Sequence, residues 1–107
     1  MQKDKVDSLL GFAVKAGQLV FGADTLDTAK AKIYLIVMCS TTAENTKKKV
    51  WQTAEKKNIP LMQSENELQY AVSRKNCKVV AVTDKQMASA IIERCGQNYT
   101  LIRSEVK

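Results

Sequence analysis

The sequence predicts an α/β protein in which helices cover both faces of a sheet, an α/β/α sandwich. Two observations lead to this prediction. Short apolar runs alternate along the chain with longer segments whose apolar residues recur at helical spacing. The clearest run, IYLIVMC at 33–39, is apolar throughout, as expected of a strand that is covered on both faces. Alternating strands and helices of this length are typical of the sandwich architecture.

The elements follow one another without a linker, an internal repeat or a low-complexity tract. Helices are expected over 5–16, 23–30, 43–57, 65–73 and 85–95, and strands over 18–21, 33–39, 59–63, 78–82 and 99–102. A chain of 107 residues is enough for one compact domain and too short for two ordinary ones. We therefore expect a single domain over residues 1–107.

Capping residues mark several of the predicted helix ends. Gly17 follows the first helix as a C-terminal cap. Side chains that accept hydrogen bonds from helix N–H groups precede the later helices: Asp24 or Thr25, Thr41 with Glu44, Ser64 with Glu67, and Thr83 with Asp84. In the helix over 43–57, the residues Val50, Trp51 and Ala54 are expected to face the core.

Charge and composition narrow the function. Seventeen Lys and Arg residues against eleven Asp and Glu give a net charge of +6, which favours a polyanionic partner and is also found in many other proteins. The chain has no histidine, so the commonest general base and every His-containing zinc site are excluded. No catalytic constellation emerges, and we expect neither enzyme activity nor a cofactor or metal.

Three further features bear on chemistry and location. Cys39, Cys77 and Cys95 lack CxxC spacing and are expected to act as small hydrophobic residues. No apolar run reaches the roughly 18 residues of a membrane span, and the N-terminus has the pattern of a helix and not of a signal peptide. We expect a cytoplasmic protein, without membrane contact and monomeric.

Three places could contact a ligand. Lysines at 47–49 and 56–57 form either a solvated helix face or a diffuse RNA-facing surface. The loop at 73–76 places two adjacent cations, Arg74 and Lys75, where they suit phosphate contact. The segment 22–25 is either an ordinary turn between strand and helix or a turn at which Gly22 lets a ligand approach the backbone.

Three segments in order and spacing resemble a known family: LLGFAVKAGQLVFG, KAKIYLIVMCSTTAENTKKKV, and the stretch from IPLMQS to VVAVTDKQMASAII. Over about residues 8–93 the chain resembles the ribosomal-protein L7Ae/L30e family of kink-turn RNA binders, and its bacterial YlxQ-like branch in particular. The resemblance implies a three-layer α/β/α sandwich with a mixed, mainly four-stranded sheet.

The family also implies binding of a sharply bent RNA through two elements. One is a Gly-x-Asn-Glu-x-x-Lys helix start, where Gly22 matches and the other three positions are Asp24, Thr25 and Thr28. The other is the loop before the last strong strand, which holds flipped-out nucleotides. Its usual Leu-Gly and Gly-Lys pairs are here Leu68-Gln69 and Ser73-Arg74.

The function predicted from the sequence is that of a non-catalytic RNA-binding protein of ribosomal or RNP type. Its partner would be structured, kink-turn-like RNA, with ribosomal RNA as a candidate. The residues expected to bind RNA are Lys15, Gly22, Asp24, Thr25, Thr28, Ser73, Arg74 and Lys75. Lys15, Arg74 and Lys75 would contact phosphates. The alternative is a protein-interaction module that keeps the fold without specific RNA recognition.

Overall fold

The computed structural model describes residues 5–26, 28, 31–95 and 98–103. In chain order the elements are α1 (Lys5–Lys15), β1 (Leu19–Phe21), the 3₁₀ turn η1 (Ala23–Thr25), β2 (Leu35–Cys39), α2 (Glu44–Lys57), β3 (Leu61–Ser64), α3 (Leu68–Ala71), β4 (Val79–Val82), α4 (Lys85–Glu93) and β5 (Tyr99–Arg103). This is the predicted order, with ends displaced by a few residues. The helix expected over 23–30 is the short η1, and residues 27, 29 and 30 lie outside the described part.

The strands form one mixed sheet in the order β1-β4-β2-β3-β5. The β2–β3 pair is parallel, and the other three pairs are antiparallel. The sheet has five strands where mainly four were expected, because β1 adds to one edge through β4 and β5 to the other through β3. The α/β class is confirmed.

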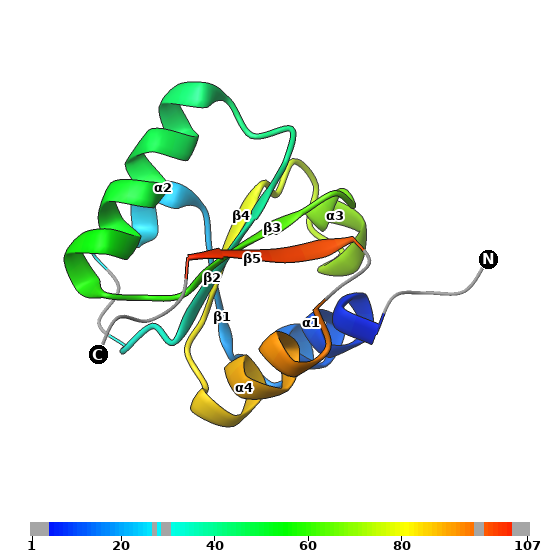
Figure 1. Cartoon of the computed structure of the whole chain (residues 1–107). Coiled ribbons are helices and arrows are strands. Elements are labelled where there is room, and N and C mark those ends of the chain that lie inside the picture. Colours follow the sequence, from blue (N-terminus) through cyan, green and yellow to red (C-terminus); the bar gives the residue numbers. More distant parts are fainter. Residues whose placement is uncertain (1–4, 27, 29–30, 96–97, 104–107) are drawn as a thin grey trace.

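Helices cover both faces of this sheet (Figure 1). One face packs against α1, α3 and α4, with Leu10, Leu68 and Ile91 among its fully buried residues. The opposite face packs against α2, where Val50 and Ala54 are fully buried. Successive residues of β2 belong alternately to the two clusters, as the twofold repeat of a strand requires. No helix in the described part of the chain is long and apolar enough to cross a bilayer.

Local capping signals were confirmed at two helix ends. Gly17 adopts a left-handed φ of 69° after α1. Its N–H donates to Val14 O, and the Gln18 N–H donates to Ala13 O, which is the Schellman arrangement. At the start of α4, the Asp84 carboxylate accepts from the Met87 N–H at 2.8 Å. Both caps need partners only within one helical turn.

Other expectations about helices, on burial, capping and length, were wrong. Trp51 is 38% exposed, because it lies 100° around α2 from the buried Val50, whereas Thr53 and Ala54 lie closer to the stripe that faces the sheet. The N-cap of α2 is Ala43, which makes no side-chain capping bond. The N-cap of η1 is Gly22, which has no side chain to make one. The predicted helix over 65–73 is the single turn α3, whose N-cap Glu67 makes no capping bond.

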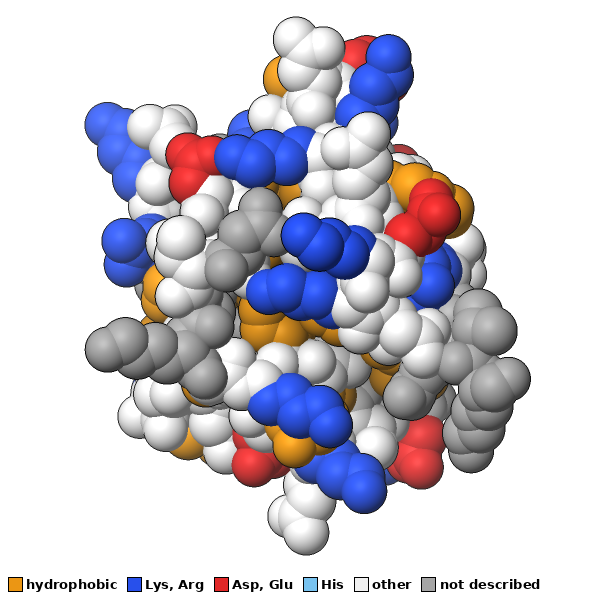
Figure 2. Space-filling view, turned by 90° about the vertical axis from the view of Figure 1, so that its left-hand side faces the viewer, with side chains coloured by type: hydrophobic (Ala, Val, Ile, Leu, Met, Phe, Trp, Pro, Cys, Tyr) orange, Lys and Arg blue, Asp and Glu red, His pale blue; other side chains and the backbone are white. Residues whose placement is uncertain are grey.

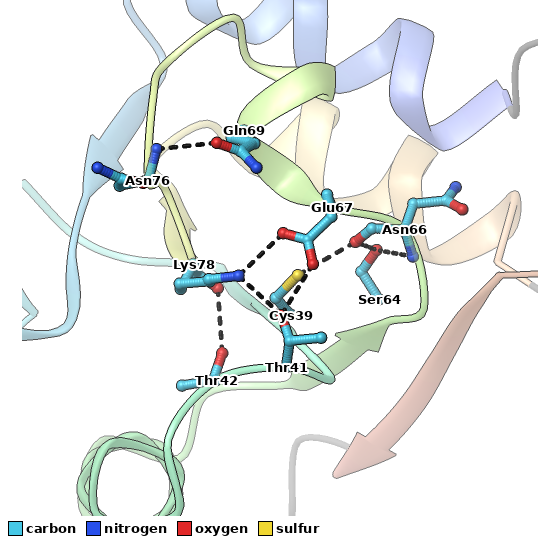
Figure 3. A network of polar contacts seen from close by, with 9 residues as sticks. All are labelled: Cys39, Thr41, Thr42, Ser64, Asn66, Glu67, Gln69, Asn76 and Lys78. Atoms are coloured by element: carbon cyan, nitrogen blue, oxygen red, sulfur yellow. Dashed lines mark hydrogen bonds and ion pairs between the residues drawn. The ribbon is translucent and has the colours of Figure 1, made fainter.

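Thr41 and Glu67, one residue from each expected capping box, instead form a polar cluster with Lys78 that joins distant segments (Figure 3). The Lys78 Nζ donates to Glu67 Oε2 at 2.9 Å and to Thr41 Oγ1 at 2.8 Å. Thr41 Oγ1 donates to Glu67 Oε1 at 3.0 Å, and the Ser64 hydroxyl bonds both backbone groups of Asn66. The Thr41–Glu67–Lys78 cluster thereby joins the turn after β2, the start of α3 and the start of β4.

This cluster shifts two ionisation equilibria. Hydrogen bonds from Lys78 and Thr41 hold the pKa of the Glu67 carboxyl below its ordinary value of 4.5. The bond to Glu67 raises the pKa of the Lys78 ammonium above 10.5. The cluster therefore makes its full contribution to stability at pH values between about 4.5 and 10.5, the ordinary pKa values of the two groups. Its contribution is lost as the pH falls through the lowered pKa of Glu67 or rises through the raised pKa of Lys78.

We expect replacement of Gly11 by alanine to stabilise the protein. Gly11 lies inside α1, and a Cβ there would meet only Ala71 O at 3.7 Å, an ordinary contact. Alanine should therefore add about 1 kcal/mol to the free energy of unfolding, measured by urea denaturation. Gly22→Ala is the matched control with the opposite sign, because its φ of 91° strains any side chain by about 1–3 kcal/mol. A loss of stability in Gly11→Ala would contradict this packing.

We expect Glu67→Gln to flatten the acid dependence of stability. The variant should be less stable at pH 7, and its midpoint of unfolding should change less than that of wild type as the pH falls below about 4.5. Glu93→Gln, a change on the exposed end of α4, is the control for removal of one negative charge. Parallel curves for Glu67→Gln and wild type in denaturation from pH 3 to 7 would show that the cluster does not stabilise the fold.

Candidate nucleic-acid interface

The two segments singled out by the resemblance lie at the same end of the sheet. Strand β1 runs antiparallel to β4, with Phe21 opposite Val80. The Gly22 N–H continues this ladder by donating to Val79 O at 2.9 Å. The turn at 22–25 after β1 and the loop at 73–78 before β4 are therefore neighbours, although about 50 residues separate them in the chain.

A cation–π contact joins this turn to this loop. The guanidinium carbon of Arg74 lies 4.5 Å from the centroid of the Phe21 ring. Such contacts contribute about 0.5–1 kcal/mol at exposed sites. The contact holds the Arg74 side chain beside Gly22, with its N–H groups available to an anion. Phe21 was not among the predicted site residues, and its position directly before the motif glycine is the signal that could have identified it.

Within the turn, the Thr25 side chain bonds to the backbone of two preceding residues. Its Oγ1 lies 2.7 Å from Phe21 O and 2.8 Å from Gly22 O, and the hydroxyl proton can be donated to either. The Thr28 hydroxyl lies 3.5 Å from Thr25 O and is exposed. Thr25 therefore closes the turn, and Gly22 is exposed beside it with no side chain to block an approaching ligand.

Asp24 is engaged by a lysine of α2. The Lys49 Nζ donates to Asp24 Oδ1 at 2.6 Å, and 94% of the aspartate side chain is exposed. This hydrogen bond and the charge of Lys49 hold the pKa of the Asp24 carboxyl below its ordinary value of 3.8. Asp24 thus stays ionised at neutral pH, and the pair leaves no net charge at this point. Lys49 belongs to the lysine stretch whose role the sequence left open.

The loop at 73–78 is held in one shape by hydrogen bonds to Gln69 (Figure 3). Ser73 and Asn76 adopt left-handed φ angles of 55° and 62°. The Arg74 N–H donates to Gln69 O at 3.0 Å, and the Asn76 N–H donates to Gln69 Oε1 at 3.1 Å. These bonds place Arg74 and Lys75 at the tip of the loop, where both are exposed.

Lys15 lies on the other side of this loop from the turn. It is exposed in the last turn of α1, and together with Ser73 it lines a groove of about 420 Å³ between α1 and α3. The structure therefore groups Ser73, Arg74 and Lys75 with Gly22 on one side and with Lys15 on the other.

Cations dominate this part of the surface. Within the described residues, Lys15, Arg74 and Lys75 make no ion pair. The side of the molecule that carries α2 also shows many Lys and Arg side chains, with Asp and Glu scattered among them (Figure 2). Among the described residues, no group of His, Cys, Asp or Glu is arranged to hold a metal ion. The arrangement is suited to holding phosphates.

Comparison with solved structures identifies the fold. A protein of unknown function from Bacillus halodurans superposes with a TM-score of 0.75 at 25% sequence identity, over 85% of this chain and 96% of that one. The Giardia lamblia 15.5kD RNA binding protein superposes with a TM-score of 0.61 at 14% identity, over 87% of this chain and 89% of that one. No curated protein is similar enough to count as a relative.

The sequence itself matches a family over most of its length. The matching family is described as the Ribosomal protein L7Ae/L30e/S12e/Gadd45 family, and the match covers residues 4–93. It includes the turn at 22–25, the loop at 73–78 and the elements that position them. The chain therefore belongs to the ribosomal protein L7Ae/L30e/S12e/Gadd45 family.

Proposed function

We propose that this protein is a non-catalytic RNA-binding protein of ribosomal or RNP type, and that it recognises structured, kink-turn-like RNA. The turn at 22–25 and the loop at 73–76 form the binding surface. Membership of the family supports this proposal, as does the fold shared with the Giardia RNA binding protein.

The observation on which the proposal depends is the contact of Arg74 with Phe21. It joins the two family segments into one surface, with an exposed cation beside the exposed Gly22, which carries no side chain. Phosphate contacts of this kind position a nucleic acid, and RNA helices are recognised mainly by shape and by extruded bases. A bent RNA would place the phosphates of one strand against Arg74 and Lys75 while its groove faces the turn.

The proposal is tested by a gel shift with a standard kink-turn RNA and with the same RNA lacking its tandem G·A pairs. Preferential binding of the intact RNA is expected. Equal binding of both RNAs would show that the protein is attracted to RNA by charge alone. If neither RNA binds at low salt, the proposal is wrong.

One observation favours the alternative of a protein-interaction module. Asp24 and Thr25, which stand at the Asn and Glu positions of the motif, are already bonded to Lys49 and to the turn backbone. A pull-down with and without ribonuclease separates the two functions, because a direct protein partner survives the digestion and an RNA-bridged one does not.

We expect the double variant Arg74→Gln/Lys75→Gln to reduce the salt dependence of RNA binding. Six phosphate contacts on a duplex give a slope of about −5 for log affinity against log salt, and removal of two should reduce it by about 2. The control removes two exposed cations at the two ends of α4, Lys85 at its first residue and Arg94 at its C-cap, in Lys85→Gln/Arg94→Gln. Binding measured from 50 to 200 mM salt should show the smaller slope only in the first variant. Equal slopes in both variants would mean that the loop makes no local contact.

We expect Asp24→Asn to tighten RNA binding. The change removes a negative charge from the surface and restores the amide of the family motif at the position that now pairs with Lys49. A gain of about 1 kcal/mol, roughly fivefold in affinity, is the size of one new hydrogen bond. Glu93→Gln removes the same charge elsewhere and should change affinity little. The affinities of both variants are measured by titration with the kink-turn RNA. Equal affinities of Asp24→Asn and Glu93→Gln would contradict a role for position 24.

A further inference from the structure

A groove borders the loop on the side away from the turn. It lies between α1 and the end of α3, has a volume of about 420 Å³, and is lined among others by Gly11, Phe12, Lys15 and Ser73. Sites for small organic ligands start at about 300 Å³. Among the residues that the structure describes, no acidic side chain lines the groove. Its walls combine apolar surface with two serine hydroxyls, from Ser8 and Ser73.

Phe12 and Lys15 stand side by side along this groove. They are three residues apart on α1, so their side chains share one helix face. The Phe12 ring is 64% exposed, although this helix buries its other face well. An exposed aromatic ring beside a free cation is the combination that binds single-stranded nucleic acid, through stacking of a base and contact with its phosphate.

The groove is continuous with the proposed RNA surface and yet separate from the family motif. Ser73 lines the groove, and the next two residues are the loop cations Arg74 and Lys75. The turn at 22–25 packs on the α2 face of the sheet through Ala23, whereas α1 and α3 cover the other face. An RNA strand that starts at the turn and passes over the loop therefore reaches the groove on the other side.

We propose that this groove binds an unpaired nucleotide of the single strand that leaves the RNA stem. Its base stacks on Phe12, its phosphate contacts Lys15, and the serine hydroxyls bond to the edge of the base. This inference rests on the proposed function, because the same RNA must occupy the loop. A single-stranded RNA is favoured over a protein partner by Lys15 in the groove and by the two exposed cations, Arg74 and Lys75, that directly follow its lining residue Ser73.

The test uses a blunt-ended kink-turn RNA and the same RNA extended by three uridines, at the 5′ end or at the 3′ end. One extension should tighten binding by wild-type protein about tenfold, which is within the range for stacking of one base on an aromatic side chain. Abasic nucleotides in that extension keep the phosphates and lose the rings, so they should remove most of this gain.

Three variants locate the gain. Phe12→Leu should abolish it without changing affinity for the blunt RNA, and Phe12→Tyr should keep it. The matched control is Tyr70→Leu, because Tyr70 is 76% exposed on α3 and does not line the groove. Both substituted rings are largely exposed, so the variants should fold, and circular dichroism checks this.

The outcomes separate this inference from the proposed function. If the blunt RNA binds and neither extension adds affinity, or if Phe12→Leu weakens blunt and extended RNA equally, the groove does not hold the strand and the RNA-binding function stands. If the blunt RNA does not bind at low salt, both proposals fail. An unchanged RNA affinity together with a Phe12-dependent dimer in sedimentation would assign the groove to a second copy of the chain and overturn the inference.

Discussion

The antiparallel pairing of β1 with β4 is the interaction on which the candidate surface depends. Only three residue pairs make it, from Leu19 opposite Val82 to Phe21 opposite Val80. Because the strands run in opposite directions, the end of β1 meets the start of β4, and this brings the turn at 22–25 to the loop at 73–78. A slip of one residue would move the Phe21 ring to the other face of the sheet and away from Arg74. The fold therefore positions the surface through the register of β1 against β4.

The chemistry that this surface offers is mostly positive charge. At the family's helix start, the side chains of Asp24 and Thr25 are bonded within the protein, and the element itself is a single 3₁₀ turn. The cations Arg74, Lys75 and Lys15 make no ion pair among the described residues. Cations and N–H groups bind phosphates in a fixed arrangement, and they distinguish RNAs by where a bend places those phosphates. For the RNA binding proposed above, this composition predicts selectivity for the shape of the RNA backbone and little direct reading of base edges at the turn.

The features predictable from the sequence are those set by short-range physics. Gly17 and Asp84 cap helices with partners inside one turn, and the apolar runs at 35–39 and 79–82 are buried throughout. The predictions of capping boxes were wrong because their residues have long-range partners. Thr41 bonds to Glu67, 26 residues away, and Lys78 bonds to both. In the same way, the contacts of Arg74 with Phe21 and of Lys49 with Asp24 depend on register and packing, which no local pattern reports. The family resemblance identified the two segments of the site, and the tertiary structure identified their partners.

The loop at 73–78 shows how this chain keeps a tight loop without the family's glycines. Ser73 and Asn76 hold left-handed angles that cost a non-glycine residue about 1 kcal/mol or more each. Gln69, which stands where the family has its first loop glycine, offsets part of this cost, because its backbone and side-chain oxygens accept the N–H groups of Arg74 and Asn76. A glycine could supply only the first of these acceptors. Side chains at these positions also restrict the loop before any ligand arrives, so less conformational entropy is lost on binding. The substitutions that depart from the motif thus form one compensating set, which holds Arg74 against Phe21 in the free protein.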